Sequence, residues 1–246
     1  MKNKNYQSWA DKQNRVWRHF QTISPETFEG AKPRLNYIIR DISRKKIAFI
    51  PRVLNIGAGN GYLEESAQQL GWDTYSLDPD DVTIKRLMKK GIKGRIGYIE
   101  DIPFDDASFD FVIASEVLEH LGDKQRQRGL GEIFRVIVKG GWFLGTVPYC
   151  ENLLLNQVVC PKCGEIFHRW GHRKSFDIKT IRDELSLFLD VVEVKRTAFV
   201  SFRGRSFLGK IKSLVRLVMA KSGIAVSVPS IYFVARKSSI VSYHPI

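Results

Sequence analysis

The chain has 246 residues, which is enough for one substantial core, so we expect one α/β domain with additions rather than two domains. It is 43% hydrophobic, but it lacks both a run of about 18 apolar residues and a hydrophobic leader, so neither a transmembrane helix nor a secretory signal is expected. The net charge is +13, and ten Lys and Arg follow Glu193 without any Asp or Glu. This asymmetry predicts a surface that meets phosphates or anionic lipid, with a solubilising face as the alternative.

Residues 1–50 are predicted to form a helical N-terminal extension. Residues 6–50 are mostly polar, with aromatic anchors at Trp9, Trp17 and Phe20. The stretch "SPETFEG", residues 24–30, interrupts this region with Pro and Gly. Apolar residues then recur at helical spacing, at Leu35, Ile38, Ile39 and Ile42.

From Pro51 short apolar runs alternate with helical patterns. Strands are predicted at residues 52–57, 72–78, 94–99, 108–117 and 142–148, and helices at residues 62–70, 81–91 and 124–141. Such alternation implies a parallel sheet with helices on both faces. Residues 51–246 are therefore expected to form a doubly wound, mostly parallel seven-stranded sheet of Rossmann-like type.

Two insertions are predicted in the second half, at residues 149–174 and 201–229. Between them lie a helix at residues 175–188, with Ser175 or Asp177 as its N-cap, and a strand at residues 190–200. The last strand is expected at residues 230–237.

A glycine-rich turn joins the first strand to its helix. Gly57, Gly59 and Gly61 in "NIGAGNGY" allow a ligand to approach the backbone amides. The dinucleotide-binding pattern Gly-x-Gly-x-x-Gly would need its third glycine at residue 62, which is Tyr62. Asp78 follows about 20 residues later at the end of the second strand, where a carboxylate can accept hydrogen bonds from a ribose. Its alternative role is to cap the helix that begins near Asp81. Together the loop and the acid indicate an adenosine-containing ligand.

Four ordered motifs carry a family resemblance. The order VLNIGAGNG, YSLDPD, EDIPFDDASFDFVIASEVLEHL and RVIVKGGWFLGTVP resembles a class I S-adenosylmethionine-dependent methyltransferase, and is most similar to the small-molecule and glycan-modifying branch. The resemblance covers residues 51–148 closely and the remaining helix and strands more loosely. It departs from the family at Asn55, where an acid is usual, and at Tyr98, where an Asp is frequent.

The resemblance implies that the cofactor is S-adenosyl-L-methionine. The glycine loop would hold its methionine part, Asp78 its ribose and residues 100–102 its adenine, while Ser115 and Glu116 would line the floor below the sulfonium. The implied binding residues are Asn55, Gly57, Ala58, Gly59, Gly61, Asp78, Pro79, Glu100, Asp101, Ile102 and Ser115.

Methyl transfer from a sulfonium depends mainly on positioning and on a water-poor site. A general base is needed only if the acceptor keeps its proton. His120 in "LEHL" is the best-placed candidate, with a structural hydrogen bond as its alternative role. Tyr149 and Glu151 are further candidate pocket residues.

The first insertion holds the spacing Cys-x2-Cys-x4-His-x3-His. Cys160, Cys163, His168 and His172 offer the sulfur and nitrogen ligands that structural zinc prefers, and one helical turn would place both histidines on one side. A zinc-braced loop forming one wall of the acceptor pocket is the resulting hypothesis. A reduced cysteine pair, or histidines that face the substrate independently, are the alternatives.

The second insertion contains "SFLGKIKSLVRLVMAKSG", which can be drawn as a basic amphipathic helix. Two hypotheses remain open for it: binding to an anionic membrane surface, or packing on the sheet. The Cys-x-x-Cys pair fits a reducing compartment, so a cytoplasmic location is expected, with a peripheral position at the inner membrane face if the surface hypothesis holds.

The leading functional hypothesis is methyl transfer to a small molecule or glycan, including a lipid-linked glycan. An RNA methyltransferase is the enzyme alternative, since a zinc loop and a basic tail also suit nucleic acid. It is disfavoured because "SEVL" stands where base amino-group methylation uses an Asn/Asp-Pro-Pro-aromatic motif. A non-catalytic cofactor-binding protein is the third alternative.

Overall fold

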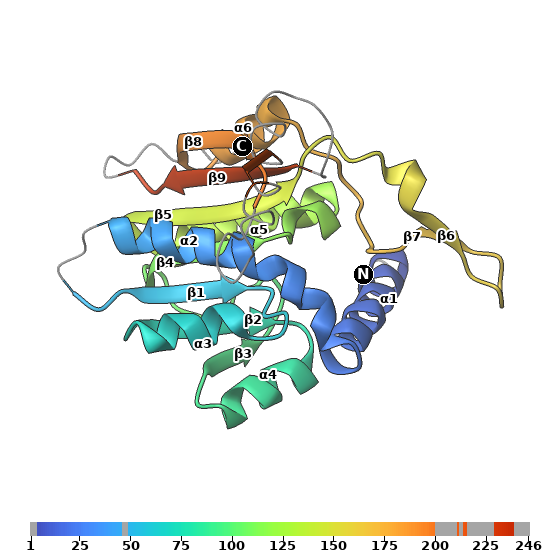
Figure 1. Cartoon of the computed structure of the whole chain (residues 1–246), viewed down its shortest axis with the longest axis horizontal. Coiled ribbons are helices and arrows are strands. Elements are labelled where there is room, and N and C mark those ends of the chain that lie inside the picture. Colours follow the sequence, from blue (N-terminus) through green and yellow to red (C-terminus); the bar gives the residue numbers. More distant parts are fainter. Residues whose placement is uncertain (1–3, 46–48, 200–210, 212–213, 216–228, 239–246) are drawn as a thin grey trace.

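The computed structural model describes residues 4–45, 49–199, 211, 214–215 and 229–238. A seven-stranded sheet with the order β3-β2-β1-β4-β5-β9-β8 runs through the molecule (Figure 1). Its strands are β1 (Arg52–Ile56), β2 (Asp73–Asp78), β3 (Lys93–Ile96), β4 (Phe109–Ser115), β5 (Ile137–Pro148), β8 (Asp190–Thr197) and β9 (Ser230–Arg236). Strands β1 to β5 pair in parallel, and β9 is antiparallel to both β5 and β8. The predicted mostly parallel, doubly wound sheet is confirmed.

Helices cover both faces of this sheet. The helical elements are α1 (Lys4–Thr22), η1 (Pro25–Ala31), α2 (Lys32–Arg44), α3 (Tyr62–Gln69), α4 (Asp81–Lys89), η2 (Leu118–His120), α5 (Asp123–Val136), η3 (Leu153–Asn156) and α6 (Ile178–Ser186). A separate hairpin of β6 (Gln157–Val159) and β7 (Ile166–His168) projects from the body beyond α1 (Figure 1). Among the described helices, none is long and apolar enough to cross a membrane.

The core lies on both sides of the sheet because successive strand residues point to opposite faces. One face packs Val53, Phe111 and Leu144 against the buried isoleucines of α2. The other packs Leu54, Val112 and Phe143 against α5 and α6. This two-sided burial explains why the central strands read as continuous apolar runs.

The boundary between α5 and β5 differs from the prediction. The helix expected to continue through residue 141 ends at Val136, and β5 begins at Ile137. Three successive β-branched residues, 136–138, favour strand geometry. Gly140 has φ +77°, and the pairing of β4 with β5 shifts register between Phe109 and Phe111. The glycines therefore belong to an irregular start of a strand rather than to a helix end.

The predicted basic insertion lies outside the described residues, apart from residues 211, 214, 215 and 229. Ile211, Leu214 and Val215 are helical and exposed.

Candidate active site

The glycine loop between β1 and α3 adopts a conformation that side chains would obstruct. Gly57 and Gly61 have φ of +84° and +88°, in the left-handed region. A Cβ at Gly57 would lie 2.9 Å from Val117 Cγ2, and one at Gly61 would lie 2.4 Å from Leu87 Cδ2. The loop at the carboxyl end of β1 therefore exposes its backbone without side chains at Gly57 and Gly61.

Asp78, at the end of β2, lies directly against this loop and is buried. Its Oδ2 accepts a hydrogen bond of 2.9 Å from the Ala58 amide, and its Oδ1 accepts one of 2.9 Å from the Asp80 amide. Burial raises the pKa of Asp78 above its ordinary value, against these hydrogen bonds. The cap of α4 is Asp80, which accepts from the Thr83 amide at 2.9 Å. Asp78 is therefore not the N-cap of α4.

Asn55 of β1 stands where the resembled methyltransferase family usually has an acid, and its side chain pairs with Glu64 of α3. Asn55 Nδ2 donates to Glu64 Oε1 at 2.8 Å, and Ser76 Oγ donates to the same oxygen at 2.7 Å. Burial raises the pKa of Glu64 to about 7, although the hydrogen bonds from Asn55 and Ser76 oppose the shift. The carboxyl group near the loop thus comes from α3 instead of β1.

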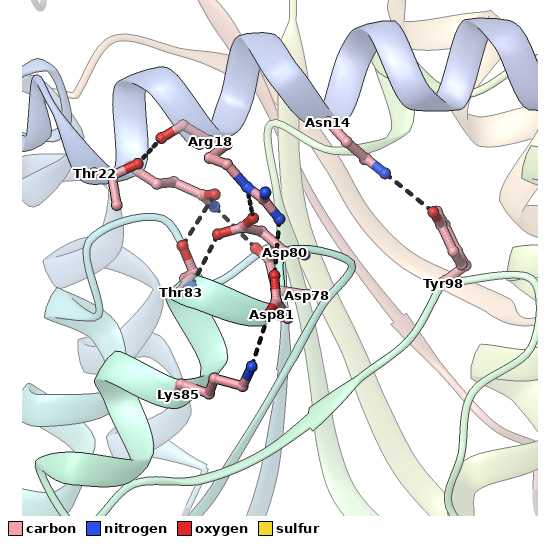
Figure 2. Close-up of polar contacts among 10 residues, drawn as sticks. Asn14, Arg18, Thr22, Asp78, Asp80, Asp81, Thr83, Lys85 and Tyr98 are labelled. Atoms are coloured by element: carbon pink, nitrogen blue, oxygen red, sulfur yellow. Dashed lines mark hydrogen bonds and ion pairs between the residues drawn. The ribbon is translucent and has the colours of Figure 1, made fainter.

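Polar contacts join helix α1 to the segments that follow β2 and β3 (Figure 2). Arg18 Nε donates to Asp80 Oδ1 at 2.5 Å and Arg18 Nη2 donates to Asp81 Oδ1 at 2.8 Å. Asn14 Nδ2 donates to the Tyr98 hydroxyl at 3.0 Å, further along the helix. These contacts join segments more than 60 residues apart in sequence.

A cavity of about 430 Å³ opens between α1, η1 and the carboxyl ends of the strands. The predicted cofactor residues that line it are Asn55, Gly57, Ala58, Gly59, Asp78, Pro79 and Ser115. Gly61, Glu100, Asp101 and Ile102 do not line it; Gly97, Tyr98 and Ile99 do. Ile102 instead packs in the core, and its amide donates to Glu132 Oε2 at 2.9 Å. The segment after β3 thus presents its first residues, not the predicted 100–102 triplet, to the cavity.

Three aromatic side chains, which we call the roof of the cavity, were not predicted from the sequence to line a pocket. Trp17 from α1, Phe28 from η1 and Trp170 from the first insertion line it. The ring of Trp17 packs against Phe28 and, edge-on at 5.1 Å, against His120. The aromatic anchors in the N-terminal region were visible in the sequence, but no local signal indicated that they face a ligand cavity.

Hydrogen-bonded polar side chains lie at the carboxyl end of β4, on the side of the cavity that we call its floor. Arg34 Nε donates to Ser115 Oγ at 2.8 Å, and Ser115 Oγ lies 3.0 Å from Thr146 Oγ1. Glu116 has φ +58°, an unfavourable backbone conformation for a non-glycine residue. Its Oε1 lies 3.9 Å from Arg34 Nη1. Strain at the end of a central strand beside a cavity is a common mark of a functional site.

His120, the predicted base candidate, lines the cavity and is buried. Burial, with a smaller contribution from the neighbouring His172, lowers the pKa of His120 to about 3. Its ring is therefore neutral near neutral pH. A group with this pKa is a weak general base, so its neutral nitrogens are better suited to hydrogen bonding or to metal coordination.

The four residues predicted as zinc ligands do not come together. Gln157 pairs with His168 at the base of the β6–β7 hairpin, and the Cys160 amide donates to Glu165 O near its tip. Cys160 is three residues from Gln157, so it stands about 10 Å along the ladder from His168. A helical turn was expected from His168 to His172. Instead, residues 166–168 form strand β7, and a turn follows this strand. The predicted zinc site of Cys160, Cys163, His168 and His172 is not confirmed.

The histidines of this segment turn toward the body of the protein instead. His168 and His172 stack with ring centroids 4.7 Å apart, and His172 packs 4.7 Å from His120. Nδ1 of His172 makes a short contact with Glu151 Oε2. Burial raises the pKa of Glu151, but the hydrogen bond and charge of His172 outweigh it, so the pKa lies below its ordinary value. His172 lines the cavity, and His168 lies behind it.

Comparison with known proteins finds a family similar to the central part of the chain. Residues 54–145 match the family described as "Methyltransferase domain". A Mycolicibacterium smegmatis protein described as a probable S-adenosylmethionine-dependent methyltransferase is 33% identical over 98 residues, which cover 39% of this chain and 37% of that protein. The phthiotriol/phenolphthiotriol dimycocerosates methyltransferase of Mycobacterium tuberculosis is 26% identical over 172 residues, which cover 64% and 60%. The chain thus spans less than two thirds of the length of these relatives.

A solved structure of similar fold is the 1,6-didemethyltoxoflavin-N1-methyltransferase of Burkholderia thailandensis, which holds 1,6-didemethyltoxoflavin and S-adenosylhomocysteine. Its TM-score is 0.66 at 13% identity, over 94% of this chain and 90% of that one. At this identity the likeness shows the fold alone. The family match indicates a methyltransferase-like domain within residues 54–145. Residues 54–145 are thus similar to methyltransferase domains in sequence, and the sheet that contains them has the fold of this solved methyltransferase.

Proposed function

We propose that the protein transfers a methyl group from S-adenosyl-L-methionine to a small molecule, or to the small reacting part of a glycan or lipid-linked glycan. The observation that supports cofactor binding is the buried carboxylate of Asp78 beside the glycine loop at Gly57 and Gly61. A buried acid at the end of a strand suits a ribose diol, and backbone amides at a helix start suit the polar methionine end. The residues present therefore fit the cofactor.

The size and the walls of the cavity support a small acceptor. The cavity of about 430 Å³ would also have to hold the cofactor, so only a small acceptor, or the small reacting part of a larger one, would fit beside it. Trp17, Phe28 and Trp170 form an aromatic roof that would exclude water from the reacting atoms. A base inside a folded RNA would have to leave its stack to pass beneath these rings, so the RNA alternative has less support.

When bound, S-adenosyl-L-methionine supplies an electrophilic methyl group on a sulfonium. The chain's own contribution would be to hold both reactants in line and to keep the site dry. Ser115 and Arg34 provide a polar floor where an acceptor heteroatom can be oriented. The non-catalytic alternative would need cofactor binding without turnover.

The acceptor class can be tested by incubating the protein with methyl-labelled S-adenosylmethionine and a fractionated cell extract. The proposal predicts that label enters the low-mass or lipid-soluble fraction and that Trp170→Ala reduces its incorporation, while Val159→Ala on the exposed hairpin does not. Label that is found in the RNA fraction and removed by ribonuclease would favour the RNA alternative. Cofactor binding without label in any fraction would favour the non-catalytic one.

A further inference from the structure

A cluster of histidines and carboxylates lies at the wall of the cavity. Glu119 and His120 come from η2, and His172 comes from the turn after the β6–β7 hairpin. One potential ligand atom from each of the three lies within 4.8 Å of the others. Backbone hydrogen bonds from the Arg173 and Lys174 amides to Glu119 O tie the two segments together.

The polar atoms of this cluster are buried without partners. Among the described residues, neither carboxylate oxygen of Glu119 and neither ring nitrogen of His120 has a hydrogen-bond partner. Glu119 is 0% exposed and His120 is 6% exposed. Leaving such groups unsatisfied costs about 1–3 kcal/mol each, and more for an ionised carboxylate. Four orphaned polar atoms in one place therefore point to a cluster built to bind a ligand.

A direct hydrogen bond within the cluster does not satisfy these atoms. His120 Nε2 lies 4.0 Å from Glu119 Oε1, which is beyond hydrogen-bond distance. Protonation of Glu119 would supply one donor, but at 4.0 Å this donor would not form a hydrogen bond with His120 Nε2. A cation placed between the groups would serve a carboxylate oxygen and an imidazole nitrogen together.

Glu151 supplies the support that metal-binding histidines usually have. Its Oε2 contacts His172 Nδ1, so the other ring nitrogen of His172 is left for a ligand. A carboxylate behind a histidine fixes the ring orientation and increases the basicity of the nitrogen that binds the metal. The Glu151 Oε1 lies 3.3 Å from His168 Nε2 on its other side.

We propose that Glu119, His120 and His172 bind a divalent first-row transition-metal ion in the wall of the cavity, with Glu151 as a positioning residue. Two imidazoles and one carboxylate suit zinc, iron, cobalt or manganese. Bonds of about 2.0–2.2 Å require ligand atoms about 3–4 Å apart, so closure of the cluster by less than about 2 Å would complete the site. Three protein ligands leave coordination positions open, and His120 and His172 face the cavity.

This site is distinct from the cysteine pair near the tip of the hairpin. It can be tested in a full-length Cys160→Ser/Cys163→Ser variant, which removes thiolate ligands that could hold a second ion. The protein would be loaded with Zn²⁺ or Co²⁺, desalted and analysed by elemental mass spectrometry. We expect about one ion per chain, and a Co²⁺ spectrum without a thiolate charge-transfer band. Absence of a retained ion in this variant would overturn the proposal.

Three further variants in the same background locate the ligands. His172→Gln and Glu119→Gln should each abolish retention of the ion, and Glu151→Gln should weaken binding about 10–100-fold without abolishing it. Retention of a full equivalent by His172→Gln with an unchanged Co²⁺ spectrum would contradict the assignment. Circular dichroism would confirm folding, and S-adenosylmethionine binding measured on the same samples would separate failure of this site from failure of the proposed function.

Discussion

The side-chain amide of Gln21 donates a 3.0 Å hydrogen bond to Oδ2 of Asp78, the carboxylate proposed to hold the ribose of the cofactor. Gln21 is buried, and its Oε1 accepts from Thr83 Oγ1 at 3.1 Å. Helix α1 therefore contacts the carboxylate that we propose to bind the ribose. In the proposed complex, the ribose hydroxyls of the cofactor would compete with the hydrogen bond from Gln21 to Asp78.

Gln21→Ala should therefore tighten cofactor binding. Loss of one competing hydrogen bond is worth about 1 kcal/mol, so the Kd for S-adenosylmethionine should fall up to about fivefold in calorimetric titration. Thr22→Ala is the control, because the Thr22 hydroxyl contacts Arg18 O on its own helix. If Gln21→Ala instead weakens binding, Gln21 is itself a cofactor ligand and does not compete with it.

Glu64 should make stability depend on pH. Its pKa is about 7 in the folded protein and about 4.5 when exposed, so between these values the folded state keeps a proton that the unfolded state has lost. The free energy of unfolding should consequently fall by roughly 2–4 kcal/mol as the pH rises from 4.5 to 7, and this contribution should be constant outside that window.

Glu64→Gln removes the titrating group but keeps an oxygen that can accept from Asn55 and Ser76. In urea denaturation at several pH values, its stability relative to the wild type should rise between pH 4.5 and 7. Glu65→Gln, at the neighbouring half-exposed residue that pairs with Lys90, should run parallel to the wild type. Parallel profiles for both variants would show that Glu64 does not titrate in this window.

Much of the fold was predictable from local patterns. Apolar runs and glycine-ended helices predicted the sheet, and the spacing from the glycine loop to Asp78 predicted that the two would meet at the carboxyl ends of neighbouring strands. These signals succeed because β1 and β2 are joined by one short helix and pair directly. The early end of α5 was missed because the pattern there suits both helix and strand.

The rest of the site depends on contacts between distant segments, which periodicity does not report. Gln21 and Asp78 are 57 residues apart, and His172 reaches Glu151 across the hairpin. The Cys/His spacing suggested one tetrahedral site, but the extended strands of the hairpin separate its two ends. Trp17 lines the cavity from α1, and the neighbouring Arg18 joins this helix to Asp80 and Asp81, more than 60 residues away in sequence.

Gly145 in β5 should tolerate no side chain. A Cβ there would lie 2.2 Å from Ala114 O and 2.4 Å from Phe233 Cζ, at the centre of the sheet. Gly145→Ala should lower the free energy of unfolding by about 2–3 kcal/mol in urea denaturation, because backbone and ring must both move. Gly30→Ala should change it by less than about 0.5 kcal/mol, since no heavy atom lies within 4 Å of the position that its methyl group would take. Equal stabilities for the two variants would contradict the packing described for β4, β5 and β9.

The central claim is that the glycine loop and Asp78 bind S-adenosyl-L-methionine, and calorimetric titration of the full-length chain tests it most directly. We predict one cofactor per chain with a Kd between about 1 µM and 1 mM. Asp78→Ala should weaken binding about 10–100-fold through lost hydrogen bonds to a charged group, while Asp183→Ala on the exposed face of α6 should leave it unchanged. Absence of binding at millimolar cofactor, or an Asp78→Ala variant that binds as tightly as the wild type, would contradict the account.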